Sequence, residues 1–198
     1  MTIPRLLLIS GSAREGSINT RLLQLAGRKA SSLGAHVTWV DLRALELPVY
    51  DADLHALKGH PNSLLQWREL MANHDGLLLA SPEYNALPTP MLINAFDWLS
   101  TVPATDELPS GSGATAGKPV GLLAASPGAL GGIRALPVVR TWLSTNFAMA
   151  VVPEQMALPG ADHAFDEDGN LVKPEMDALL DKVVASVMRQ ARWRLSGA

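Results

Sequence analysis

The sequence predicts an α/β fold in which helices cover both faces of an open, doubly wound sheet of five parallel strands. Short apolar runs without polar interruptions recur along the chain, as expected for strands that are buried on both faces. Stretches with apolar residues at helical spacing separate these runs, which is the strand and helix alternation of parallel sheets. With 198 residues and a hydrophobic content of 47%, the chain can form one sizeable core, so we expect a single domain over residues 1–198.

The first part of the chain reads as a strand, a helix and a second strand. Residues 6–9 form a continuous apolar run that ends in a small, polar segment. Apolar residues then recur at helical spacing from Ile18 to Leu33, and Gly34 stands where this helix would end. Residues 36–40 alternate as a second strand, and residues 45–61 are expected to be irregular.

The rest of the chain supplies three more strands and four helices. Strands are expected at residues 77–80, 120–125 and 149–152, the last of them closed by Pro153. Helices are expected at residues 62–73, around 91–99, after the Gly131-Gly132 pair, and at 176–191. Pro137 must lie in the first turn of the third of these helices or kink it. Residues 103–118 lack periodicity and are expected to form a mobile surface loop.

Composition excludes several classes of function. The net charge of -3 and the pI near 5.9 leave no excess positive charge for a nucleic acid or an anionic membrane surface. The absence of cysteine excludes disulfides, thiolate metal sites and thiol nucleophiles, so any redox chemistry must come from a cofactor. The apolar run near the start is too short for a signal peptide or a membrane span, which favours a cytoplasmic location.

Metal binding is not expected from the polar residues. The five histidines have no metal-ligand spacing and are interpreted as surface residues: His36, His55, His60, His74 and His163. The acidic residues between 162 and 168 lack the spacing of a calcium loop and are interpreted as a solvated turn. The five tryptophans are expected to be anchors in the core or in an interface.

Three loops with small or polar residues follow the first, third and fourth predicted strands. They comprise residues 11–19, 81–85 and 126–132. In the flavodoxin-like strand order 2-1-3-4-5 these three strand ends are neighbours, and ligands bind beyond the carboxyl ends of the strands at the point where the order reverses. The three loops are therefore expected to form one binding site.

The first loop has the composition of an anion site. Gly11 lets the backbone approach a ligand, Ser12, Ser17 and Asn19 offer polar side chains, and Arg14 adds a guanidinium. The spacing matches neither the dinucleotide fingerprint nor the P-loop, so a phosphate monoester fits better. The alternative is a plain turn in which Ser17 caps the following helix.

The second and third loops could accommodate a planar ring. Tyr84 provides a flat aromatic side chain and Asn85 an amide, and both follow Pro82, which constrains the backbone. In the third loop, Gly128, Gly131 and Gly132 permit close approach of a ligand to the backbone. The alternatives are a turn capped by asparagine and an ordinary strand-to-helix turn.

Together these motifs resemble the NADPH-dependent FMN reductases, flavodoxin-like proteins that include quinone, azo-dye and chromate reductases. The resemblance covers nearly the whole chain: Gly-Ser-x-Arg-x-x-Ser-x-Asn begins at Gly11, Pro-Glu-Tyr-Asn at Pro82 and Gly-Gly-x-Arg at Gly131. One departure is Ile93, which stands where the family often has a lysine. The resemblance implies FMN as the cofactor, held by Gly11, Ser12, Arg14, Ser17, Ile18, Asn19, Pro82, Glu83, Tyr84, Asn85, Ser126, Gly128 and Gly131.

The resemblance also implies an activity. NADPH or NADH would deliver hydride to FMN, and the reduced flavin would pass electrons to a small acceptor such as a quinone, free flavin, azo compound or metal oxyanion. No side chain needs to act as a catalytic acid or base, because the cofactor carries the chemistry. A homodimer or homotetramer with the flavin near the subunit interface is implied as well. The alternatives are a flavodoxin-type electron carrier without NAD(P)H activity and a protein that has lost the cofactor.

Overall fold

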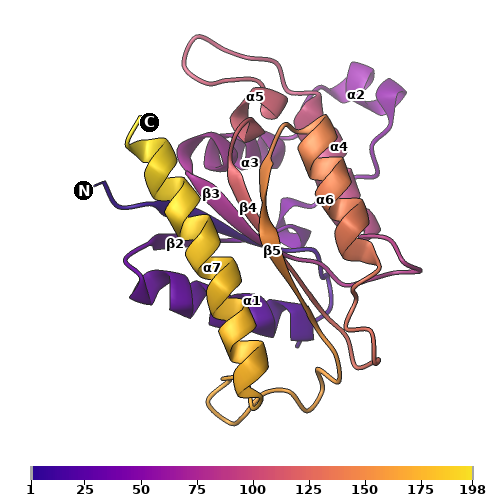
Figure 1. Cartoon of the computed structure of the whole chain (residues 1–198). Coiled ribbons are helices and arrows are strands. Elements are labelled where there is room, and N and C mark those ends of the chain that lie inside the picture. Colours follow the sequence, from indigo (N-terminus) through magenta and orange to yellow (C-terminus); the bar gives the residue numbers. More distant parts are fainter. Residues whose placement is uncertain (1, 198) are drawn as a thin grey trace.

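The computed structural model describes residues 2–197 and contains the expected doubly wound sheet (Figure 1). All neighbouring strands are parallel, and their order is β2-β1-β3-β4-β5. The strands are β1 (Arg5–Ser10), β2 (His36–Asp41), β3 (Gly76–Ala80), β4 (Pro119–Ala125) and β5 (Ala150–Leu158). Every residue of β3 and β4 is buried, which explains why their sequences are continuous apolar runs.

Helices cover both faces of this sheet (Figure 1). On one face, α1 (Ile18–Ser32) and α7 (Pro174–Leu195) pack over one core. On the other, a second core contains α3 (Asn62–Asn73), α4 (Pro90–Ser100) and α6 (Ala135–Asn146). Short helices η1 (Arg43–Leu45), α2 (Ala52–Lys58) and α5 (Gly111–Thr115) complete the chain. Among the helices of residues 2–197, none is both long and apolar enough to cross a membrane.

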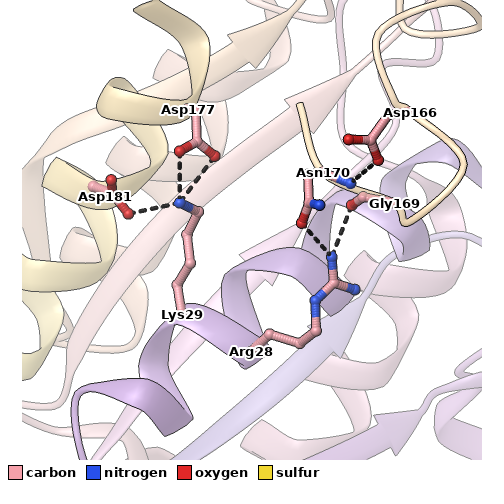
Figure 2. A network of polar contacts seen from close by, with 7 residues as sticks. All are labelled: Arg28, Lys29, Asp166, Gly169, Asn170, Asp177 and Asp181. Carbon is pink, nitrogen blue, oxygen red and sulfur yellow. Dashed lines mark hydrogen bonds and ion pairs between the residues drawn. The ribbon is translucent and has the colours of Figure 1, made fainter. Parts of the chain in front are cut away.

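Polar contacts attach α1 to α7 and to the turn before α7 (Figure 2). Lys29 Nζ lies 2.9 Å from a carboxylate oxygen of Asp177 and 2.8 Å from one of Asp181, one turn farther along α7. Arg28 donates a hydrogen bond of 2.8 Å to the carbonyl of Gly169. Each of these partly exposed contacts contributes little to stability, and together they join α1, the helix that begins at the first loop, to α7 and the turn before it.

The fifth strand is longer than the sequence predicted. It continues through Pro153 to Leu158 instead of ending there. In the described chain β5 pairs with β4 alone, and the pairing shifts register between Val120 and Leu122. A proline is tolerated at such an edge position because the missing N–H need not pair with another strand.

Two segments expected to be irregular contain helices. Asp51 caps α2, accepting a hydrogen bond of 2.8 Å from the Leu54 N–H, so residues 45–61 are more ordered than their prolines and glycines suggested. Residues 103–118 include α5, whose first residue must be glycine because a Cβ on Gly111 would lie 1.7 Å from the Leu99 carbonyl oxygen. A local cap thus orders the first segment, and close packing against α4 orders the second.

One histidine departs from the expected surface position. His74 is buried, and its ring nitrogens lie 2.7 Å from the Leu70 carbonyl and 2.8 Å from the Thr38 hydroxyl. Burial lowers the pKa of His74, so the ring is neutral at pH 7. It connects the end of α3 to β2 and serves the core.

Candidate functional site

The three loops meet at the carboxyl ends of β1, β3 and β4, where they line a common pocket of about 210 Å³. The first loop contributes Ser12, Arg14, Ser17, Ile18 and Asn19, the second Pro82, Glu83 and Tyr84, and the third Ala125, Ser126 and Pro127. Nine of the residues that were predicted from the sequence therefore lie around one cavity. The pocket sits beside the switch point between β1 and β3.

The first loop is fixed at its start by neighbouring elements. The Gly11 N–H donates to the Ala80 carbonyl at 2.8 Å, and the Thr89 hydroxyl donates to the Gly11 carbonyl at 2.6 Å. A Cβ on Gly11 would lie 3.2 Å from both the Ser81 and the Thr89 hydroxyl oxygens, so a larger residue would require a small shift of these side chains or of the loop. Thr89 was not predicted from the sequence, although a threonine before Pro90 is a typical helix start.

The beginning of α1 offers groups to the pocket that are suited to an anion. Ser17 is the N-cap of α1, and its hydroxyl accepts a hydrogen bond of 3.3 Å from the Thr20 N–H. The capping alternative for Ser17 is therefore correct, and it is compatible with an anion site. The N–H groups of Ile18 and Asn19, in the first turn, have no acceptor within the helix, and the helix dipole places partial positive charge there.

Asn19 makes structural contacts that the sequence did not predict. Its side-chain amide donates to the Ala125 carbonyl and accepts from the Ala125 N–H, both at 2.9 Å. The residue is 4% exposed, so these buried bonds join the start of α1 to the end of β4. These bonds use one N–H and one lone pair of the amide, and Asn19 also lines the pocket.

The second loop forms a tight hairpin turn. Tyr84 and Leu87 exchange backbone hydrogen bonds of 2.9 and 3.0 Å around Asn85 and Ala86. Both central residues have positive φ, 53° at Asn85 and 67° at Ala86, as in a type I′ turn. Asparagine suits this conformation, whereas alanine is strained there. The turn leaves the Tyr84 side chain 51% exposed at the mouth of the pocket.

Glu83 connects the second loop to the start of α6. Its carboxylate accepts hydrogen bonds from the backbone N–H groups of Arg134 and Ala135, at 2.8 and 3.2 Å, at the start of α6. The Arg134 side chain donates from Nε at 2.7 Å and from a terminal nitrogen. Burial by itself would raise the pKa of Glu83, but these bonds outweigh it and hold the pKa below its usual value.

The third loop is held against the end of β5. The Ser126 N–H donates to the Leu158 carbonyl at 3.1 Å, and the Ser126 hydroxyl accepts from the Gly128 N–H at 3.2 Å. A Cβ on Gly131 would lie 2.7 Å from backbone atoms of Leu158 and Pro159, so the glycine is needed for packing. A Cβ on Gly128 would make only an ordinary contact, 3.6 Å from the Ser126 hydroxyl oxygen, so this position is less crowded.

The described residues contain no group of three His, Cys, Asp or Glu side chains that could share a metal ion. The polar side chains around the pocket also form no pair of titratable groups suited to acid–base catalysis, because Glu83 is committed to Arg134 and α6. The arrangement can hold a phosphate and a planar ring.

Comparisons with known proteins agree with this geometry. Residues 4–163 match the NADPH-dependent FMN reductase family. An NAD(P)H-dependent FMN reductase of Pseudomonas aeruginosa is 33% identical over 98% of this chain and 97% of its own length, and a quinone reductase of Pseudomonas putida is 29% identical over 91% and 92%. A solved structure of the flavoenzyme NAD(P)H:(acceptor) oxidoreductase from Paracoccus denitrificans superposes with a TM-score of 0.78 at 23% identity, over 96% of this chain and 98% of that one.

Proposed function

Because the chain belongs to the NADPH-dependent FMN reductase family, we propose that it binds FMN and uses NAD(P)H to reduce a small acceptor such as a quinone. The observation that carries this proposal is the convergence of the three loops on one pocket beside the switch point of the sheet. Free flavin, azo compounds and metal oxyanions are further acceptors of the same kind.

The first loop fits the phosphate of FMN. The N–H groups of the first turn of α1 and the helix dipole favour an anion at this place. Arg14 is exposed and lines the pocket, so its guanidinium can reach the phosphate from the solvent side. The hydroxyls of Ser12 and Ser17 remain able to donate, because both accept backbone N–H groups in the structure.

The second and third loops fit the ring system. Tyr84 and Pro82 offer apolar surface, and the backbone of residues 83–85 offers polar groups at the ring edge. Bound FMN would supply the redox chemistry, taking electrons as hydride from NAD(P)H and passing them to the acceptor. The protein positions the ring: Glu83 fixes the second loop against α6, and Ser126 fixes the third loop against β5.

A second copy of the chain would complete the site. A pocket of about 210 Å³ is smaller than typical cofactor sites of ~300–1,000 Å³, so the ring needs a further wall. Four large apolar residues in or directly after the second and third loops are about half exposed: Tyr84, Leu87, Leu130 and Ile133. We infer a homodimer or homotetramer with these residues in the interface, each chain acting as a single FMN-binding domain in the cytoplasm.

The absorbance spectrum of the purified protein, followed during titration with NADPH or NADH, tests the proposal. A flavin band near 450 nm that bleaches on titration and returns on adding a quinone is the expected result. A protein that stays colourless after incubation with FMN, with an unchanged melting temperature, would refute FMN binding, because a ligand of the folded state must stabilise it. A band that NAD(P)H does not bleach would indicate an electron carrier.

Arg14→Ala tests the position of the phosphate. The substitution should weaken FMN far more than riboflavin, which has the same ring but no phosphate. Arg189→Ala, on α7 and away from the pocket, is the matched control and should change neither affinity. Equal losses for the two flavins would contradict the assignment of the first loop.

A further inference from the structure

A second pocket lies on the other side of the first loop. Its volume of about 460 Å³ falls in the range of small-molecule sites, and it opens between this loop and the carboxyl end of β2. Ser12 and Arg14 line both pockets, so the first loop is their common wall. A ligand bound over the first pocket could therefore reach the second across this loop.

Trp39 gives the second pocket an aromatic wall. It lies on the edge strand β2, and 44% of its surface is exposed although it is a large apolar residue. An exposed indole face beside a cavity is suited to stacking against a planar base, an interaction that tolerates any purine or pyrimidine.

Charged groups of both signs surround this aromatic wall. The guanidinium of Arg43 has a weak contact of 3.4 Å with the Ala13 carbonyl, and neither Arg14 nor Arg43 belongs to an ion pair within residues 2–197. Asp41 accepts the Arg43 N–H at 2.9 Å with one carboxylate oxygen, which leaves the other available to a hydroxyl donor. With Glu15, the pocket has two positive and two negative groups. This combination suits a ligand that carries both a phosphate and hydroxyl groups.

The location supports the same chemistry. In dinucleotide-binding sheets, the strand next to β1 ends in an acidic residue that binds the adenosine ribose, and a nearby arginine accommodates a 2′-phosphate. Asp41 and Arg43 stand at the end of β2, which pairs with β1. The chain lacks the glycine motif that binds the pyrophosphate of a dinucleotide, so it shares with those sheets only the residues that bind the adenosine.

We propose that the pocket between the first loop and β2 binds the adenosine half of NAD(P)H, with Trp39 stacking on the adenine, Asp41 holding the ribose and Arg43 pairing with the 2′-phosphate of NADPH. The inference depends on the proposed function, because it assigns the second pocket to the co-substrate of that reaction. It predicts that Trp39 serves both co-substrates, whereas Arg43 serves NADPH specifically.

Two variants of the FMN-loaded protein test this assignment. Trp39→Ala should raise the KM for NADPH and NADH about tenfold, in line with the usual value of base stacking. Arg43→Ala should raise the KM for NADPH about tenfold and leave the KM for NADH within twofold. In both variants kcat should stay unchanged, since the lost contacts are equal in the ground and transition states. Trp193→Ala and Arg189→Ala, both on α7, are the matched controls.

Calorimetric titration with adenosine 2′,5′-bisphosphate provides a readout that does not depend on turnover. The wild-type protein should bind this probe, and Trp39→Ala and Arg43→Ala should weaken its binding about tenfold while FMN content and melting temperature stay unchanged.

If both variants keep the wild-type KM values and probe affinity while NADPH oxidation persists, the inference is wrong and the proposed function stands. If the FMN-loaded wild type oxidises neither NADPH nor NADH, the proposed function fails and the assignment with it. If the protein binds FAD more tightly than FMN, and Trp39→Ala weakens FAD binding, the pocket binds the adenosine of the flavin and the assignment to NAD(P)H is wrong.

Discussion

Replacing Glu83 with alanine should destabilise the protein by about 2 kcal/mol. The side chain is 8% exposed, and its loss leaves the Arg134 and Ala135 N–H groups at the start of α6 without an acceptor, which costs about 1 kcal/mol, as for other caps. The ion pair adds about 1 kcal/mol or less, because the Arg134 side chain is 58% exposed and screened by water. For a chain of this length, the total corresponds to a melting temperature lower by about 4–8 °C.

Thermal unfolding followed by circular dichroism measures this loss. Arg134→Ala should cost less than Glu83→Ala, because the carboxylate would still cap the backbone of α6. Glu167→Ala, in an exposed turn, is the control and should change little. A loss below about 0.5 kcal/mol for Glu83→Ala, or an equal loss for Arg134→Ala, would refute the capping role.

The same variant makes a prediction about pH. Because the folded protein lowers the pKa of Glu83, the stability that the carboxylate contributes is fully present above its unfolded pKa of about 4.3. It is lost as the pH falls through the lower, folded pKa. The difference in melting temperature between wild type and Glu83→Ala should therefore be constant from pH 8 to about 5 and shrink below about 4. A constant difference down to pH 2 would show that the charge is unimportant.

Three further substitutions test individual features. Ala86→Gly should stabilise the protein by up to about 1 kcal/mol, measured by urea unfolding, because it relieves the backbone strain at φ 67°. This gain should exceed the cost of the greater freedom of glycine in the unfolded chain, and a loss of stability would show that Ala86 is not strained. Asn19→Ala should lower the free energy of unfolding by about 2–4 kcal/mol, because both backbone groups of Ala125 lose their partner. It should weaken the binding of FMN and of riboflavin equally, and a selective loss of FMN binding would place the amide on the phosphate. Burial and the nearby Arg194 lower the pKa of Lys118 to about 8. As the pH rises from 8 to about 10.4, the stability of the wild type should therefore increase relative to that of Lys118→Met. A stability difference that does not change over this pH range would refute the prediction.

The sequence predicted the sheet well because its three central strands, β1, β3 and β4, are almost entirely buried. Strands such as β3 and β4 need apolar residues on both faces, and that requirement appears directly as a continuous apolar run. The edge strand β5 was truncated in the prediction because Pro153 reads as a stop, and only the sheet shows that its position tolerates a proline. Helix α5 was missed because a glycine such as Gly111 disfavours a helix in sequence, and only its close packing against Leu99 of α4 explains its presence there.

The site was predicted at the level of loops and less accurately at the level of atoms. The motifs around Arg14 and Tyr84 identified residues that line the pocket. The roles of Asn19 and Glu83 required the structure, because their partners Ala125 and Arg134 lie 106 and 51 residues away. A polar side chain in a binding motif looks the same in sequence whether it contacts the ligand or the backbone of a neighbouring loop.

Hydrogen bonds fix the three loops to neighbouring elements, and this explains how the site can hold the proposed cofactor although few of its polar side chains lack a partner within the described chain. Asn19 ties the first loop to the end of β4, Glu83 ties the second to α6, and Thr89 ties the start of the first loop to α4. Ordering flexible loops at the moment of binding would cost free energy that the contacts with the ligand must offset. Since these bonds form within the chain, the loops need little further ordering when a ligand binds. Asn19, Glu83 and Thr89 therefore fix the backbone, and in the proposed FMN complex the N–H groups of α1, Arg14 and the hydroxyls of Ser12 and Ser17 would recognise the phosphate.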